Sequence, residues 1–372
     1  MNSKTFRATA VLVGAVIGAG IFGLPYVINQ IGFLPGLIYL FFLAGMVLLL
    51  NLLYGEVVLR TAGDHQLSGY AAIYLGGWGK LVATLAIFVS AYGALLAYLI
   101  KTGEFLNLIF PGTSPVIFSL FFFVCASTAL FFGLRSISFL EGLLVSLLLA
   151  LIGLLSLLGI GEIQLAHFSP PNLDFLFLPY GVILFAFFGA SVIPEMEEIL
   201  RSQPEQLKKA IVWGSLIPLL VYLLFSSVVV GISGPLTSDD AISGLIGLLP
   251  DWIVHLGAFL GVLTMTTSYL ALGYVLREVW FRDFQLARLA AFVLAILPAW
   301  LLFLAGAKNF IQVLGITGAL MGGLEGVLII VLFHRAQKVG QRQPAYSLRL
   351  PSFLLAALAM IFLIGMFSPL FS

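Results

Sequence analysis

Charged side chains are scarce in this 372-residue chain. Only 9% of its residues are Asp, Glu, Lys or Arg, whereas a soluble domain has about 25%. Hydrophobic residues make up 61% of the sequence, which indicates a membrane protein with many spans. The formal net charge of +1 gives no support for a nucleic-acid partner.

Cysteine and histidine are also rare, with one and four residues. The single cysteine, Cys125, excludes a disulfide within the chain, and the four histidines lie far apart in the sequence. We therefore expect no metal site built from cysteine and histidine. The sequence contains no HExxH motif, and no GxSxG motif accompanied by histidine and aspartate, so we do not expect an enzyme.

Eleven apolar segments are each long enough to cross a bilayer, which takes about 20 mainly apolar residues. We therefore expect an all-α polytopic membrane protein that forms a single transmembrane domain over residues 1–372. The predicted spans cover residues 8–30, 34–59, 80–109, 115–133, 138–160, 177–200, 209–233, 252–280, 287–306, 309–333 and 349–371.

Basic residues gather on one side of the predicted membrane. If the N-terminus is cytoplasmic, all of the 17 lysines and arginines except Lys101 and Lys308 fall on the inner side. This bias predicts insertion in the cytoplasmic (inner) membrane with the C-terminus outside. Two connectors, residues 64–78 and 239–249, are expected to form short helices at the inner and outer surfaces.

The first span carries an unusual cluster of helix-weakening residues. Gly14, Gly18, Gly20, Gly23 and Pro25 fall within an otherwise apolar stretch. Glycine costs about 1 kcal/mol and proline about 3 in a helix interior, so local unwinding is cheap here. Unwound backbone is tolerated at membrane depth only beside protein or a cavity, which predicts a central ligand site. The alternative is a GxxxG face that packs two helices closely.

The sixth span repeats this anomaly. Gly189, Ala190 and Ser191 are followed at once by Pro194 and a carboxylate cluster. Interrupted segments at matching positions in two halves of a chain indicate the binding site of a transporter with inverted repeats. We expect a five-plus-five inverted repeat of the leucine-transporter type, with helices 1 and 6 broken. The repeats cover about 8–160 and 177–333, and an extra helix covers about 349–371.

Several motifs resemble those of a known family. They are IGAGIFGLP (residues 17–25), GFLPG (32–36), YGEVVLRT (54–61), FAFFGASVIP (185–194) and TSYLALG (267–273). These stretches are similar to the amino acid/auxin permease family of the amino acid–polyamine–organocation superfamily, which includes the bacterial hydroxy/aromatic amino acid permeases. The resemblance implies secondary active transport of an amino acid. One departure is Gly189, because many members have a histidine after the aromatic pair.

A zwitterionic substrate needs N–H donors for its carboxylate and carbonyl acceptors for its ammonium group. Broken helix 1 is expected to offer the donors and broken helix 6 the acceptors. Aromatic and polar side chains from these spans and span three are candidates for the side-chain pocket, although aromatics also serve as ordinary packing. The predicted substrate-binding residues are Ile17, Gly18, Ala19, Gly20, Ile21, Phe22, Ser90, Tyr92, Phe185, Ala186, Phe187 and Gly189.

Span eight offers hydroxyl groups to a coupling cation. Thr264, Thr267 and Ser268 lie on one helix face at spacings of three and four residues. Carbonyls of Gly14 and Ile17 would complete a set of oxygens suited to Na⁺. This arrangement resembles the sodium site of sodium-coupled relatives of the fold. The alternative is that the hydroxyls bond back to carbonyls of their own helix.

Two carboxylates inside predicted spans are candidates for a proton relay. Glu325 lies in the middle of span ten among glycines, and Glu56 lies near the inner end of span two. Ionisable groups at membrane depth are costly and usually functional. For Glu56 the alternative is an ion pair with Arg60, four residues further on.

The predicted function is a cation-coupled amino acid symporter that works by alternating access. Ion-independent exchange or facilitation of amino acids is the alternative, and a channel is a further one. No cofactor is expected apart from Na⁺ or H⁺ as the coupling ion. The expected partners are a small-molecule amino acid and the lipid bilayer, without nucleic acid, and the expected assembly is a monomer.

Overall fold

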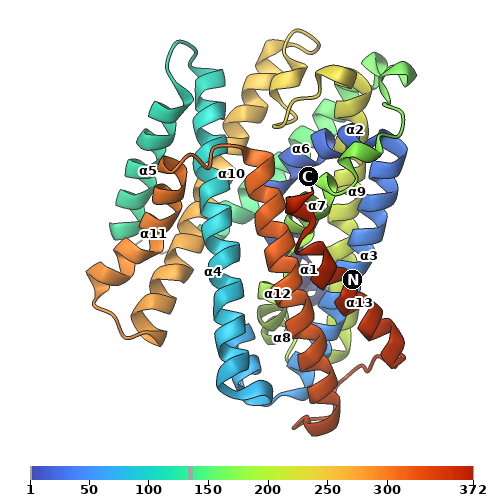
Figure 1. The fold of residues 1–372 in the computed structure, drawn as a ribbon, viewed down its shortest axis with the longest axis vertical. Coiled ribbons are helices and arrows are strands. Elements are labelled where there is room, and N and C mark those ends of the chain that lie inside the picture. Colours follow the sequence, from blue (N-terminus) through green and yellow to red (C-terminus); the bar gives the residue numbers. More distant parts are fainter. Residues whose placement is uncertain (1, 133–136, 372) are drawn as a thin grey trace.

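The computed structural model describes residues 2–132 and 137–371, which fold into a bundle of α-helices without a β-strand in the described part (Figure 1). The longest connectors are residues 160–177, between α6 and α7, and residues 234–250, between α9 and α10. Their bounds are α1 Ser3–Val16, α2 Gly20–Ile31, α3 Phe33–Arg60, α4 Leu67–Ile109, α5 Pro115–Phe132, α6 Ile137–Gly159, α7 Leu178–Phe187, α8 Ile193–Ile199, α9 Leu207–Ser233, α10 Asp251–Glu278, α11 Arg288–Leu304, α12 Phe310–Val339 and α13 Ser352–Gly365.

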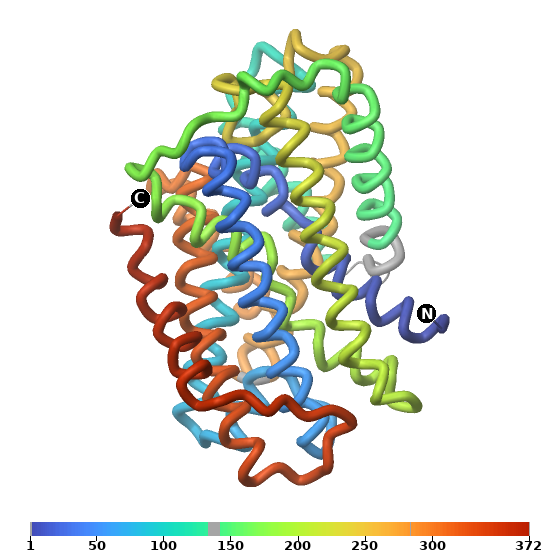
Figure 2. Tube along the Cα trace, turned by 90° about the vertical axis from the view of Figure 1, so that its right-hand side faces the viewer, coloured from blue at the N-terminus to red at the C-terminus, as the bar shows by residue number. Residues whose placement is uncertain are grey.

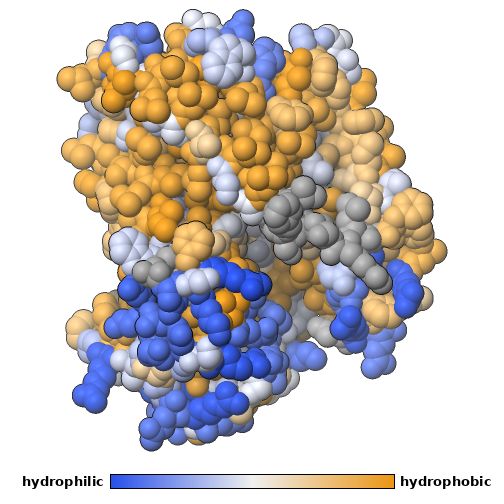
Figure 3. Space-filling view, turned by 180° about the vertical axis from the view of Figure 1, so that it is seen from behind, coloured by the Kyte–Doolittle hydropathy of each residue, from blue (hydrophilic) through white to orange (hydrophobic). Residues whose placement is uncertain are grey.

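The helical segments agree with the predicted spans. Within the described residues, nine segments are long and apolar enough to cross a membrane, and α1 and α2 together form a tenth. The remaining predicted span, residues 287–306, corresponds to the shorter apolar helix α11. Figure 3 shows apolar residues over most of the upper part of one face and hydrophilic residues gathered at its lower end. This is a polytopic membrane protein.

Both predicted breaks are present. α1 and α2 meet at an angle of 61° across a short gap, so together they form one broken span. Figure 2 shows α1 running from the N-terminus at the edge of the molecule into its middle. The sixth predicted span is interrupted between α7 and α8, where a 3₁₀ turn covers Ala190–Val192.

Packing places the breaks near the centre of the bundle. α9 packs against both α1 and α2, and α7 packs against α2. α12 contacts α3, α4, α7 and α13, which makes it a central helix (Figure 1). Each break is therefore surrounded by protein, as unwound backbone requires in a bilayer.

The two connectors differ from prediction in different ways. The expected helix over residues 64–78 exists, but it is joined to the third span as the start of α4, with a kink at Gly76, whose φ is 69°. The prediction of a helix over residues 239–249 is wrong. Only a 3₁₀ turn forms, at Ser243–Leu245, because the backbone has positive φ on either side of it, 61° at Ala241 and 74° at Gly247.

Candidate functional site

The first break exposes unpaired N–H groups. Ile17 leaves the helical conformation, with φ −80° and ψ 91°, and its N–H closes α1 on the carbonyl of Val13 at 2.9 Å. In the described part of the chain, the N–H groups of Gly18, Ala19 and Gly20 have no acceptor. They stand at the N-terminal end of α2, where the helix dipole favours an anion such as a carboxylate.

The second break lies opposite the first. Phe188 is extended, with φ −74° and ψ 114°, and Gly189 follows it. A side chain at Gly189 would bring a Cβ atom to 2.7 Å from Val16 and 2.8 Å from Leu12, both on α1. Gly189 therefore lets α1 pack directly against the second break.

The two breaks touch at Gly20. A Cβ atom there would lie 2.6 Å from Cα and 2.8 Å from Cβ of Ala186, so only glycine fits. Around Gly18, in contrast, nothing lies within 4 Å of such a Cβ atom. The GxxxG packing alternative, which would use Gly14 and Gly18, is therefore wrong, because nothing lies within 4 Å of such a Cβ atom at either residue. The close packing occurs at Gly20, and Gly18 borders open space next to the unpaired N–H groups.

Two predicted aromatic residues lie in the closed packing around the breaks. The Phe22 ring meets the Phe105 ring edge-on at a centroid distance of 5.2 Å, and Phe22 is only 1% exposed. Phe187 is buried against the ring of Tyr222 on α9, with centroids 5.0 Å apart. Ile17, Ala19, Ile21 and Ala186 are also buried, and Phe185 is half-buried.

The two predicted residues from α4 point elsewhere. The hydroxyl of Tyr92 donates to the carbonyl of Leu294 at 2.7 Å and accepts from the Trp280 indole N–H at 2.8 Å. These bonds direct Tyr92 towards α11 and the π-helical turn Val279–Asp283 after α10 rather than towards either break. Ser90, two residues earlier, is half-buried.

The hydroxyl groups of span eight, which is α10, differ in their hydrogen bonds. Thr267 donates to the carbonyl of Thr264 at 2.9 Å within α10, which is the alternative considered from the sequence. The Thr264 hydroxyl is buried and has no hydrogen-bond partner among the described residues. Gly14 has open space around it, and Ser268 is half-buried.

Glu325 is buried in the middle of α12, with an exposed fraction of 6%. A Cβ atom on either neighbouring glycine would crowd another helix: Gly322 faces Leu184 of α7 and Gly326 faces Phe362 of α13. Within the described residues, its carboxylate has no hydrogen bond or ion pair. The predicted burial towards the bundle is confirmed.

Glu56 on α3 contacts both its own helix and the connector before α13. Its carboxylate pairs with Arg60 at 2.7 Å, as the alternative reading predicted, and accepts from the N–H of Leu348 in the connector before α13. In the same connector, the hydroxyl of Tyr346 donates to the carbonyl of Leu52 at 2.7 Å. Burial, and the nearby charge of Glu56, raise the pKa of Tyr346 and keep this donor protonated. Glu56 thus fixes the connector to α3, which is a poor arrangement for a proton relay.

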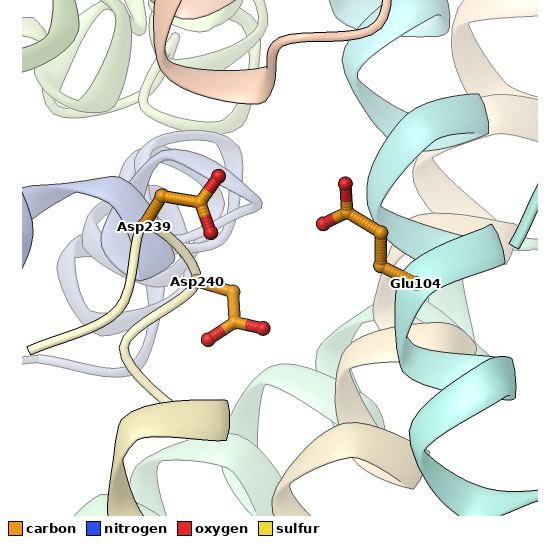
Figure 4. A group of neighbouring side chains, drawn as sticks. All are labelled: Glu104, Asp239 and Asp240. Atoms are coloured by element: carbon orange, nitrogen blue, oxygen red, sulfur yellow. The ribbon is translucent and has the colours of Figure 1, made fainter. Parts of the chain in front are cut away.

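An ionic cluster closes the end of the molecule that carries the α9–α10 connector. The ammonium group of Lys101 on α4 is fully buried and pairs with Glu104 and, at 3.5 Å, with Asp239. It also lies 4.4 Å above the ring of Phe310. Figure 4 shows Glu104 facing Asp239 and Asp240 across the space between α4 and the connector. Lys101 pairs with a carboxylate of α4 and with one of the connector, so it joins the two as a latch.

A cavity of about 590 Å³ lies beside this latch. It is bounded by α2, α7, α12 and the residues that follow α9. Tyr26, Gly181, Asp239 and Gln312 are among its lining residues. The cavity reaches both broken spans, because Tyr26 belongs to α2 and Gly181 to α7.

Sequence reasoning missed Tyr222. Its hydroxyl lies 2.7 Å from the carbonyl oxygen of Val16 and 2.9 Å from that of Ala186, so a residue of the intact helix α9 links the two breaks. A lone tyrosine in an apolar span gives no local signal of such a role.

Two broken helices that meet inside a membrane-spanning bundle define a transporter, and the fold agrees with solved transporters. The chain superimposes on MhsT in complex with L-phenylalanine with a TM-score of 0.67 and 14% identity, covering 100% of this chain and 98% of that one. It also superimposes on Mhp1, a nucleobase-cation-symport-1 family transporter with bromovinylhydantoin bound. The TM-score is 0.65 and the identity 13%, covering 98% of this chain and 90% of that one. Both likenesses show the fold.

The chain belongs to the tryptophan/tyrosine permease family, whose sequence profile matches residues 1–370. It is 24% identical to tyrosine-specific transport system 1 of Haemophilus influenzae, over 92% of this chain and 90% of that protein. It is also 24% identical to glutamine transporter 2 of Aliivibrio fischeri, over 86% of both chains. The chain is therefore a permease and not an enzyme.

Proposed function

We propose that this permease is a secondary active amino acid transporter that works as a cation-coupled symporter by alternating access. The observation that carries the proposal is the meeting of the two breaks. Unpaired N–H groups of Gly18 to Gly20 suit a carboxylate, and carbonyls at the ends of α1 and α7 suit an ammonium group. An amino acid presents these two charges on neighbouring carbons.

The named relatives support neutral amino acids as the first substrates to test. They are described as transporters of tyrosine and of glutamine, neither of which carries a charged side chain. Phe22 and Phe187 lie beside the breaks and are buried, so they suit an uncharged side chain better than an ionised one.

The coupling cation is Na⁺ or H⁺, and each has its own candidate residues. Na⁺ would use the Thr264 hydroxyl, which is buried without a partner, together with Thr267, Ser268 and carbonyls of the first break. A proton would use Glu325, whose carboxyl group is buried in the middle of α12. No cofactor is required in either case.

We further propose that the transporter works as a monomer in the cytoplasmic membrane, with a cytoplasmic N-terminus and an external C-terminus. The distribution of basic residues supports this orientation, because only Lys101 and Lys308 fall on the outer side. The latch and the cavity beside it then belong to the external end of the transport pathway.

The test is uptake of labelled amino acids into proteoliposomes that contain the purified protein. Accumulation above the external concentration, driven by an imposed Na⁺ or pH gradient, is expected. Gly18→Leu, which fills the open space at the first break, should abolish it while the protein remains folded. Equilibration without accumulation would indicate a facilitator, uptake only into preloaded vesicles would indicate an exchanger, and single-channel currents would indicate a channel.

A further inference from the structure

Tyr54 on α3 is a buried tyrosine whose hydroxyl has no hydrogen-bond partner among the described residues. Its exposed fraction is 1%. One turn earlier on the same helix face, the side-chain oxygen of Asn51 is also buried without a partner in that part of the chain. A buried polar atom left unpaired costs about 1–3 kcal/mol, and native structures contain few of them. Two such atoms together therefore indicate that this face of α3 serves a polar species and not packing alone.

Tyr54 lies close to the buried carboxyl group of Glu325 on α12. α3 packs against α12, and the two side chains are near enough for the charge of Glu325 to act on Tyr54. The other helices packed on α12 are α4, α7 and α13, and within the described residues none of them brings a charged side chain that acts on Glu325. The Tyr54 hydroxyl is therefore available to exchange a proton with Glu325.

A second tyrosine continues this series towards the surface. The ring of Tyr70, near the start of α4, meets the Tyr54 ring edge-on with centroids 5.8 Å apart. His65, in the connector before α4, meets Tyr70 at a centroid distance of 5.5 Å and is half-buried. The charged side chains that act on Tyr70 are Asp64, Glu197 and Glu198. Asp64 is exposed, so the series runs from the middle of α12 to water.

We propose that Tyr54 and Tyr70 form the path by which a proton leaves Glu325 for the inner side of the membrane. The proposal rests on amino acid symport as the proposed function and takes the proton as its coupling ion. The Glu325 carboxyl group gives its proton to the Tyr54 hydroxyl oxygen, and Tyr54 passes its own proton to Tyr70. Tyr70 in turn gives its proton to water beside His65. Each tyrosine ends with one proton, so the products are a carboxylate at Glu325 and one proton in the inner water.

A hydroxyl suits such a path because it both accepts and donates a hydrogen bond. Tyr54→Phe keeps the ring and its contact with Tyr70 but removes the hydroxyl. Proton transfer through a positioned side chain is typically faster by about 10²–10⁴-fold, so we expect net uptake to fall at least about tenfold in this variant. Exchange of internal for external substrate does not need the proton to leave Glu325. It should therefore keep the wild-type rate.

The experiment measures both rates in proteoliposomes, with labelled neutral amino acids as the probes and tyrosine and glutamine first. Net uptake into empty vesicles is driven by a pH gradient, and a trapped dye records the internal pH. Exchange is measured in vesicles preloaded with the same unlabelled amino acid. The control is Tyr269→Phe on α10, because Tyr269 is also buried and meets a ring, that of Phe122, edge-on at 5.3 Å. It should leave the ratio of net uptake to exchange unchanged.

Tyr70→Phe should show the same pattern, and it decides the matter if Tyr54→Phe does not fold. A wild-type ratio in the folded variant would overturn the proposal, and so would an equal loss of net uptake and exchange, which indicates a structural role. Accumulation driven by Na⁺ without a change of internal pH would also reject the path, although symport would stand. If wild-type protein accumulates no amino acid under any gradient, the proposed function itself fails.

Discussion

Gly20→Ala tests the contact on which the site depends. The added methyl carbon would lie 2.6 Å from Cα of Ala186. Unbonded carbon atoms prefer separations of about 3.5–4.0 Å, so the two breaks must move apart by roughly 1 Å. Overpacking of this kind costs about 1–3 kcal/mol. The helical preference of alanine recovers at most about 1 kcal/mol, and Gly20 is only the first residue of α2.

The same displacement should weaken substrate binding. The N–H groups of the first break and the carbonyl of Ala186 at the second must reach one small molecule together. A loss of about 1.4 kcal/mol in this fit lowers affinity tenfold, and we expect at least that for Gly20→Ala. The thermal midpoint of the purified protein should fall as well, because the strain is present without substrate.

Two other glycines give matched controls for this measurement. At Gly18 and at Gly45 on α3, nothing lies within 4 Å of an added Cβ atom. Gly18→Ala should keep the wild-type thermal midpoint but lose affinity, because it borders the open space at the first break. Gly45→Ala should change neither. The assay is thermal unfolding in detergent across a series of substrate concentrations, and a Gly20→Ala variant with wild-type midpoint and affinity would refute the reasoning.

Three further sets of substitutions test the roles of Glu325, the span-eight hydroxyls and Lys101. Glu325→Gln should alter the pH dependence of transport if its carboxyl group carries the coupled proton; an unchanged profile with normal expression leaves only packing. Thr267→Ala combined with Ser268→Ala should remove any difference between affinities in Na⁺ and in an impermeant organic cation, and equal wild-type affinities in both salts would exclude sodium. Lys101→Met should release the α9–α10 connector and speed its proteolysis on intact vesicles, whereas Lys308→Met should not; equal protection in both would contradict the latch.

Much of the architecture could be predicted because membrane insertion depends on local composition. Each span is recognisable from its own apolar residues, whatever it packs against. The breaks were predictable for the same reason, since glycine and proline weaken a helix through their own backbone properties at Gly14 to Pro25 and at Gly189 to Pro194. The absence of a helix over residues 239–249 was not predictable, because the positive φ values of Ala241 and Gly247 that interrupt it depend on how the connector packs.

The sequence by itself determined which segments cross the membrane and where two of them break, because these are properties of neighbouring residues. Only the tertiary structure decided which groups meet. Tyr222 lies 206 residues from Val16, yet its hydroxyl bonds the Val16 carbonyl. Tyr92 turned towards α11, and Glu56 became a clamp for a connector 292 residues away in the chain. Such partners depend on how distant helices pack, and no local pattern of side chains encodes that packing.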